Sequence, residues 1–179
     1  MAKLITVKEA AAYLRVTEKT IYRLLNRGSI PATKVGRQWR FDKASIDEWL
    51  YEKPVKTRVN LLVIDDEEVV RLLFKDALEE LGHTVITAET ASKGLELVKQ
   101  QDFALVFLDL KMPGIDGAEL FHQIKTTKPK LPVIIMTGYP NSDIMARALA
   151  YSPFGVINKP FGELDIVRAV STFLGIIPA

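Results

Sequence analysis

The chain has 179 residues, of which 48% are apolar and 26% are charged, a composition typical of one large or two small globular domains. It contains no cysteine, which excludes a disulfide framework, a thiol nucleophile and a Cys-ligated zinc site. The uncharged apolar runs are far shorter than the roughly 18 residues of a membrane span, and we expect no secretion signal, because the first residues contain no apolar h-region. We therefore expect a cytoplasmic protein without a membrane partner.

Charge is distributed unevenly along the chain. Residues 1–60 contain 13 Lys and Arg against 6 Asp and Glu, a net charge of +7, whereas the corresponding counts for residues 61–179 are 11 and 16, a net charge of −5. A basic block joined to an acidic block predicts two domains with different partners. We place one domain at 1–52 and a second at 60–179, joined by a linker at 53–59 in which Pro54 disfavours helix.

The basic block predicts a helix-turn-helix pattern followed by a hairpin. Thr6 and Glu9 have the spacing of a capping box, and Thr17 is a suitable N-cap for a second helix that ends before Gly28. Extended runs on both sides of Gly36 indicate a hairpin. In chain order, the predicted elements are helices at 6–14 and 17–27, a hairpin within 30–41 and a helix from 42 to about 50.

A second helix with exposed donors fits the major groove of DNA, and a hairpin wing is placed to contact phosphates or the minor groove. We interpret Trp39, Phe41 and Trp49 as a small core rather than as base-stacking groups. The residues that we expect to contact double-stranded DNA are Lys19, Thr20, Tyr22, Arg23 and Arg27 on the helix, and Lys34, Arg37, Gln38 and Arg40 on the wing. The alternative is a solvated basic face on a protein-interaction module.

Residues 4–50 resemble the excisionase/MerR-like winged helix-turn-helix family. The resemblance is carried by Thr-Val-Lys-Glu-Ala-Ala-Ala-Tyr-Leu at 6–14, Val-Thr-Glu-Lys-Thr-Ile-Tyr-Arg-Leu-Leu at 16–25, and Gly-Arg-Gln-Trp-Arg-Phe at 36–41. It implies binding to duplex DNA, in transcription or in recombination.

The acidic half alternates strand and helix five times, which predicts a doubly wound, flavodoxin-like α/β fold with a five-stranded parallel sheet. Three of the candidate strands are nearly continuous apolar runs, as expected for parallel strands that are buried on both faces. The predicted strands are 61–64, 84–87, 104–108, 133–136 and 156–157, and the predicted helices are 67–81, 91–100, 117–125, 143–150 and 163–174.

Polar residues follow four of these strands: Asp65 and Asp66, then Asp109, Thr137 and Lys159. The carboxyl ends of parallel strands meet at one edge of the sheet, so we expect these side chains to converge. Close carboxylates need a cation to stay ionised together, and an all-oxygen set suits Mg²⁺. Thr and Lys beside them would bind phosphoryl oxygens, and an Asp carboxylate can accept a phosphoryl group. Singly, each residue also fits a helix cap or a turn.

Residues from about 60 to 174 resemble the receiver domain of two-component response regulators. The matching segments are Leu-Leu-Val-Ile-Asp-Asp-Glu at 61–67, Val-Phe-Leu-Asp-Leu-Lys-Met-Pro-Gly-Ile-Asp-Gly at 106–117, Ile-Ile-Met-Thr-Gly at 134–138 and Ile-Asn-Lys-Pro-Phe at 157–161. The resemblance implies that Asp109 accepts a phosphoryl group from the phosphohistidine of a histidine kinase or phosphotransfer protein.

The same resemblance assigns roles around this acceptor. It implies that Asp66, Asp109 and the backbone carbonyl of Lys111 ligate Mg²⁺, and that Asp65 holds a metal-bound water. It also implies that Thr137 and Lys159 bind phosphoryl oxygens, that Gly138 leaves room for the donor histidine and that the Lys159–Pro160 bond is cis. Val156 stands where receivers usually carry Tyr or Phe. Phe154 lies two residues earlier, and the route by which the signal leaves the site stays open.

We therefore expect a phosphorylation-controlled, homodimeric DNA-binding response regulator, with the domain order reversed relative to most of that class. It would not be an enzyme beyond accepting and losing its own phosphoryl group. The alternative is a receiver-containing adaptor whose winged module binds another protein. Lys111 argues against a haloacid-dehalogenase-type hydrolase, which places an acid/base Asp there, and no Gly-x-Gly-x-x-Gly follows Ile64. We expect His83 and His122 to be solvated.

Overall fold

The computed structural model describes residues 4–14, 16–26, 28, 30–52 (backbone only at 51 and 52), 58–114 and 116–175. The chain divides into two compact units, one formed by Met1–Lys56 with Val167–Ala179 and the other by Thr57–Ile166. Residues 53–57 of the proposed linker lie outside the described residues. None of the helices in the described ranges combines the length and the hydropathy that crossing a bilayer requires.

The first unit contains the predicted helix-turn-helix and hairpin. The capping box is present, because Glu9 N donates to Thr6 Oγ1 at 3.2 Å and Thr6 N donates to Glu9 Oε2 at 2.8 Å. Thr17 starts the second helix by accepting from Thr20 N at 3.2 Å. The elements are α1 (Val7–Leu14), α2 (Glu18–Asn26), β1 (Thr33–Val35), β2 (Gln38–Arg40) and α3 (Lys43–Glu52).

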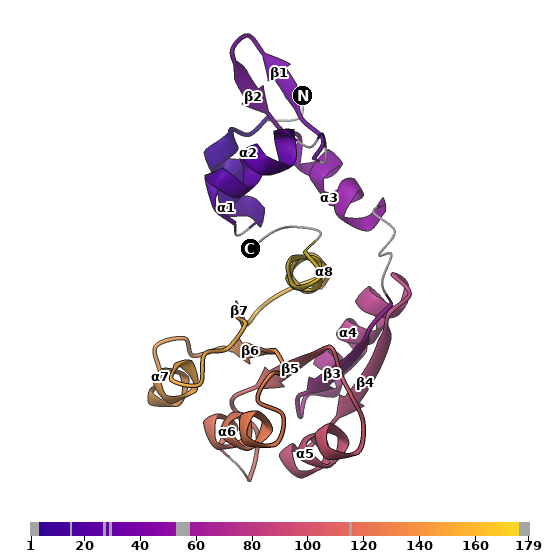
Figure 1. Cartoon of the computed structure of the whole chain (residues 1–179), viewed down its shortest axis with the longest axis vertical. Helices are drawn as coiled ribbons and strands as arrows, with labels where there is room; N and C mark the ends of the chain where they lie inside the picture. The colour runs from indigo at the N-terminus through magenta and orange to yellow at the C-terminus, as the bar shows by residue number, and fades with distance from the viewer. Residues whose placement is uncertain are drawn as a thin grey trace. The chain divides into compact units, whose positions relative to one another are not determined.

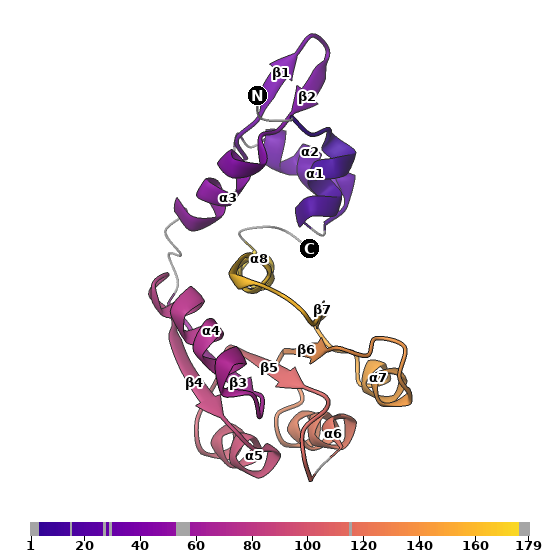
Figure 2. The same ribbon diagram turned by 180° about the vertical axis from the view of Figure 1, so that it is seen from behind.

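Hairpin β1–β2 projects beyond α1 and α2 in this unit (Figure 2). Val35 pairs with Gln38 in an antiparallel register, which leaves a two-residue loop whose first residue, Gly36, has a φ of +62°. Glycine adopts this value at low cost, and the loop matches the short turns that hairpins favour. Apolar side chains from the helices form the small core with Phe41, and the fully or almost fully buried ones are Ala10, Leu14, Ile21, Leu24, Ile46 and Leu50.

The second unit is the predicted doubly wound fold. Its five strands are all parallel and lie in the order β4-β3-β5-β6-β7, which is the flavodoxin-like order. The strands are β3 (Asn60–Ile64), β4 (Thr84–Ala88), β5 (Leu105–Asp109), β6 (Val133–Thr137) and β7 (Gly155–Asn158), and the helices are α4 (Glu68–Glu79), α5 (Ala91–Gln100), α6 (Gly117–Thr127) and α7 (Asp143–Leu149). The last helix, α8 (Glu163–Phe173), begins in this unit, and its residues from Val167 onward belong to the first unit.

Helices α5 and α6 cover one face of the sheet and α4 lies on the other (Figure 1). The face toward α5, α6 and α7 holds a continuous core that includes Leu108, Phe121 and Met145. On the opposite face Phe74 of α4 packs against Phe107, with ring centroids 4.6 Å apart. The predicted elements are correct to within one or two residues at their ends.

The prediction of a solvated His83 is wrong. Its side chain is buried, with 5% of its surface exposed, and neither ring nitrogen has a hydrogen-bond partner among the described residues. The chain turns back after α4, where Gly82 has a φ of +85° and His83 N donates to Leu78 O at 3.1 Å. This turn brings the ring inward, and burial lowers the pKa of the imidazole. His122 is exposed, as predicted.

Candidate functional site

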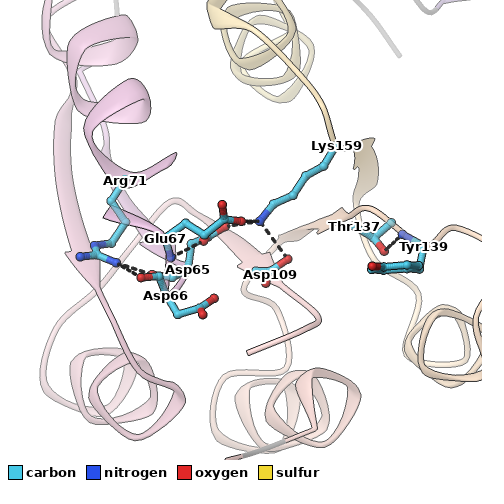
Figure 3. Close-up of polar contacts among 8 residues, drawn as sticks. All are labelled: Asp65, Asp66, Glu67, Arg71, Asp109, Thr137, Tyr139 and Lys159. Carbon is cyan, nitrogen blue, oxygen red and sulfur yellow. Dashed lines mark hydrogen bonds and ion pairs between the residues drawn. The ribbon is translucent and has the colours of Figure 1, made fainter. Parts of the chain in front are cut away.

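Three carboxylates converge at the carboxyl edge of the second unit's sheet (Figure 3). Asp65 and Asp66 directly follow β3, and Asp109 is the last residue of the neighbouring strand β5. One oxygen from each of the three lies within 4.8 Å of the other two. The parallel pairing of β3 with β5 creates this proximity, because it brings the ends of both strands to the same edge.

Lys159 enters the same site from the end of β7. Its Nζ lies 2.9 Å from Asp65 Oδ2 and 3.4 Å from Asp109 Oδ1. Lys159 N also donates to Thr137 O at 2.8 Å, which ties the end of β7 to β6. The peptide bond from Lys159 to Pro160 is cis, as predicted. Burial alone would lower the pKa of the Lys159 ammonium, but hydrogen bonds to Asp65 and Glu67 and the charge of Asp109 raise it.

Burial makes the ionised forms of the Asp65 and Asp109 carboxylates less favourable. Burial, together with the charge of Asp65, raises the pKa of Asp109 to about 6, although the nearby charge of Lys159 opposes the shift. Burial also raises the pKa of Asp65, although hydrogen bonds from Lys159 and Glu67 N oppose the shift. A further cation would relieve this cost. Three oxygen donors without a sulfur or imidazole ligand fit Mg²⁺, a hard ion that takes carboxylates together with water and phosphoryl oxygens.

Two residues of the site were not predicted from the sequence. Arg71 donates through the same nitrogen to Asp65 O at 2.7 Å and to Asp66 O at 2.9 Å, which fastens the acidic loop to α4. Glu67 Oε1 accepts from Lys159 Nζ at 2.9 Å. The first contact involves backbone carbonyls and the second joins distant parts of the chain, so neither has a local sequence signal beyond the acidic run after β3.

Thr137 and Lys111 lie on the same edge of the sheet. Thr137 is the last residue of β6, and its Oγ1 accepts from Tyr139 N at 3.0 Å (Figure 3). The Lys111 ammonium lies 4.2 Å from the centre of the Tyr139 ring, and Lys111 N–H donates to the Asp109 carboxylate. A cavity of about 210 Å³ beside them is lined by Leu110, Lys111, Thr137, Tyr139, Ser142 and Ile144. The contact of the Lys111 carbonyl with a metal stays a prediction.

The first unit presents most of the predicted DNA-binding residues at its surface. Those that are exposed are Lys19, Tyr22 and Arg23 on α2 and Lys34, Arg37 and Gln38 on the hairpin, and Arg40 is half-buried. Thr20 corrects the prediction: it is buried, and its hydroxyl lies 3.1 Å from that of Thr17. It belongs to the inner side of the start of α2 and is unsuited to contact DNA. Arg27 lies outside the described residues.

The family of the second unit follows from its match to known sequences. The response regulator receiver domain family matches residues 61–171, an interval that holds the acidic cluster, Thr137 and Lys159. The chain belongs to the response regulator receiver family. A helix-turn-helix domain family matches residues 4–53, so the receiver is preceded by a helix-turn-helix domain.

Individual relatives agree with this assignment for the receiver. The DNA-binding transcriptional regulator NtrC of Escherichia coli is 37% identical over 109 residues, which cover 61% of this chain and 23% of NtrC. Sporulation initiation phosphotransferase F of Bacillus subtilis is 30% identical over 114 residues, 64% of this chain and 92% of that protein. The chain thus spans about a quarter of the length of several regulators that it matches.

Solved structures match the receiver fold in the same interval. A CheY-like receiver domain from Methanospirillum hungatei superposes with a TM-score of 0.63 at 27% identity, over 66% of this chain and 95% of that one. NtrX from Brucella abortus superposes with a TM-score of 0.61 at 30% identity, over 66% of this chain and 27% of NtrX.

The receiver departs from the usual family pattern at β7. Val156 is half-buried and packs against the core formed with α5, α6 and α7. Phe154, two residues earlier, has 45% of its surface exposed. Val156 carries no aromatic ring that could change its packing. The aromatic residue closest to Thr137 in the sequence is Tyr139, whose backbone N–H donates to Thr137 Oγ1.

Proposed function

We propose that the receiver domain accepts a phosphoryl group on Asp109 from the phosphohistidine of a histidine kinase or phosphotransfer protein. The observation that carries this proposal is the position of Asp109, buried among converging carboxylates and 3.4 Å from the ammonium of Lys159. Asp65, Asp66, Asp109 and the Lys111 carbonyl would hold Mg²⁺. When bound, the ion would neutralise charge on the carboxylates and on the transferred group.

The residues around Asp109 account for the chemistry. A carboxylate oxygen of Asp109 attacks phosphorus, the bond between phosphorus and the donor imidazole nitrogen breaks, and the imidazole leaves with the electron pair. Asp109 must be ionised to attack, which its pKa of about 6 allows at neutral pH. Lys159 and the Thr137 hydroxyl would donate to phosphoryl oxygens.

Acetyl phosphate provides the test of the acceptor. With Mg²⁺, the full chain should gain the mass of one phosphoryl group in an acid-stable, base-labile linkage, and Asp109→Asn should not. The matched control is Asp76→Asn, which changes an exposed carboxylate on α4 and should leave labelling unchanged. Equal labelling of Asp109→Asn would refute the assignment.

We further propose that the helix-turn-helix domain binds double-stranded DNA. The exposed cations on α2 and on the hairpin support this, as does the charge of +7 in residues 1–60. Binding by the full chain should weaken steeply with salt, with a slope near −0.9 for each of about 4–6 neutralised phosphates. Duplex binding that is absent at low salt would favour the alternative, an adaptor whose helix-turn-helix domain binds a protein.

The two activities would be coupled through assembly. One small DNA-binding module buries too little surface for tight specific binding, so we infer that a homodimer places two modules on repeated half-sites. Phosphorylation of Asp109 would favour the arrangement that binds DNA differently. Molar mass and duplex affinity should therefore both change with beryllofluoride, which mimics the phosphoryl group. No change in either would make the receiver a scaffold that does not switch.

A further inference from the structure

The carboxylate of Glu67 makes a contact that its place in the chain does not require. Glu67 is the N-cap residue of α4, but its side chain makes no hydrogen bond to the helix. Polar side chains at this position usually accept from the unpaired N–H groups of the first turn. Glu67 Oε1 instead accepts from Lys159 Nζ, which is 92 residues away in the chain. The side chain is therefore directed into the site rather than onto its own helix.

Glu67 also accepts a hydrogen bond from one of the N–H donors of the Lys159 ammonium group. An ammonium group has three N–H donors. Three carboxylate oxygens lie around this one: Asp65 Oδ2 at 2.9 Å, Glu67 Oε1 at 2.9 Å and Asp109 Oδ1 at 3.4 Å. The ammonium is thus surrounded by three carboxylates before any phosphoryl group is present, and its contact with Glu67 has the geometry of a hydrogen bond.

Glu67 differs from the other two carboxylates around Lys159. The side chains of Asp65 and Asp109 are 0% and 5% exposed, whereas that of Glu67 is 61% exposed. Glu67 is also not one of the three carboxylates whose oxygens converge. A phosphoryl group on Asp109 adds new acceptors for Lys159, so Glu67 is the partner that is most easily released to water.

We propose that Glu67 is a positioning residue that opposes the phosphorylated state by competing with the phosphoryl oxygens for Lys159. The inference rests on the proposed phosphoryl acceptance at Asp109 and concerns the regulation of that site. While Asp109 is unmodified, Glu67 holds the ammonium of Lys159. Once the phosphoryl group is present, that hydrogen bond is exchanged for one to a phosphoryl oxygen, and the exchange weakens the modified state.

The test is a beryllofluoride titration of the full chain at saturating Mg²⁺, followed by the amide NMR signals of the receiver. Glu67→Gln should bind beryllofluoride about two- to fivefold more tightly, the range expected for one partly exposed ion pair. Glu67→Asp should gain a similar affinity for beryllofluoride. The shorter side chain keeps the negative charge, but Asp is a favoured N-cap and should bond to the start of α4 instead of to Lys159. Glu68→Gln, an equal charge change at the next residue, should leave the midpoint unchanged.

The variants separate contact from charge. Weaker binding by Glu67→Gln would show that Glu67 prepares Lys159 for the phosphoryl group and would overturn the proposal. An equal gain in Glu68→Gln, or wild-type behaviour of Glu67→Asp, would assign the effect to long-range repulsion and would also overturn it. Failure of the wild-type chain to bind beryllofluoride at all is a different result, because it removes the proposed function and the competition together.

Discussion

Charged side chains are buried in the receiver site but exposed on the surface of the helix-turn-helix domain. In the receiver, Asp65 and Asp109 are buried beside Lys159, where each charge depends on specific neighbours. On the helix-turn-helix domain, cations such as Arg23 and Arg37 are exposed, where charges are solvated and screened. A single substitution should therefore abolish the chemistry of the receiver, whereas DNA binding should decline gradually as cations are removed.

The largest effect is expected for Asp66→Ala. It removes a carboxylate from the convergent cluster and leaves Asp109 poorly neutralised. Mg²⁺ affinity should fall at least about tenfold, since even indirect partners of metal ligands contribute that much, and labelling by acetyl phosphate should fall with it. Mg²⁺ titration followed by NMR, and labelling with and without EDTA, measure both. Asp76→Ala is the control, and an unchanged titration for Asp66→Ala would remove this residue from the metal site.

Gly117 of the receiver and Gly36 of the helix-turn-helix domain differ in the space that an added side chain would have. A Cβ on Gly117 would lie 2.4 Å from Leu110 Cα, whereas one on Gly36 meets nothing within 4 Å and is disfavoured only by the φ of +62°. Gly117→Ala should lower the free energy of unfolding by roughly 2–3 kcal/mol, and Gly36→Ala by about 1 kcal/mol.

Urea denaturation followed by circular dichroism measures these changes. Gly162→Ala is the control in the receiver, because its Cβ would meet nothing within 4 Å and its φ is not in the left-handed region. A loss for Gly117→Ala no greater than for Gly162→Ala would show that the start of α6 can move away from Leu110.

Smaller and graded effects are expected on the helix-turn-helix domain. Arg37→Ala, on the hairpin, should weaken binding to all duplexes and reduce the salt slope by about 0.9. Arg23→Ala, on α2, should change sequence preference by about 1–3 kcal/mol at one base pair. Fluorescence anisotropy with a set of duplexes at several salt concentrations separates the two. If both variants lose affinity uniformly, α2 does not read bases.

The smallest effect concerns pH and His83. Burial lowers the pKa of the folded imidazole below the ordinary 6.5, so the unfolded chain binds the proton more readily. The contribution of the neutral, buried His83 imidazole to the free energy of unfolding is fully present above pH 6.5. It is lost as the pH falls, by at most about 1.4 kcal/mol per pH unit for one proton. His83→Leu should flatten the dependence of the unfolding free energy on pH between 7 and 5. His122→Leu, at an exposed position, should leave it unchanged.

Much of the receiver was predictable from its sequence alone. The apolar runs before Asp65 and Asp109 were long enough to identify buried parallel strands, and parallel topology brings the ends of such strands together. That rule needs only the order of the elements, and it places four site residues at the same edge of the sheet: Asp65, Asp66, Asp109 and Lys159. The capping box at Thr6 and the hairpin turn at Gly36 were also predictable, since both are local patterns of a few residues.

The tertiary structure decided which polar groups are buried and what they contact. Thr20 and His83 were assigned to the surface, but their burial depends on which side of α2 faces the core and on how the chain turns after α4. Glu67 contacts Lys159 across 92 residues, and Arg71 contacts backbone carbonyls. Such contacts have no period and no fixed spacing in the sequence. They arise only when packing brings the ends of separate elements within hydrogen-bonding distance.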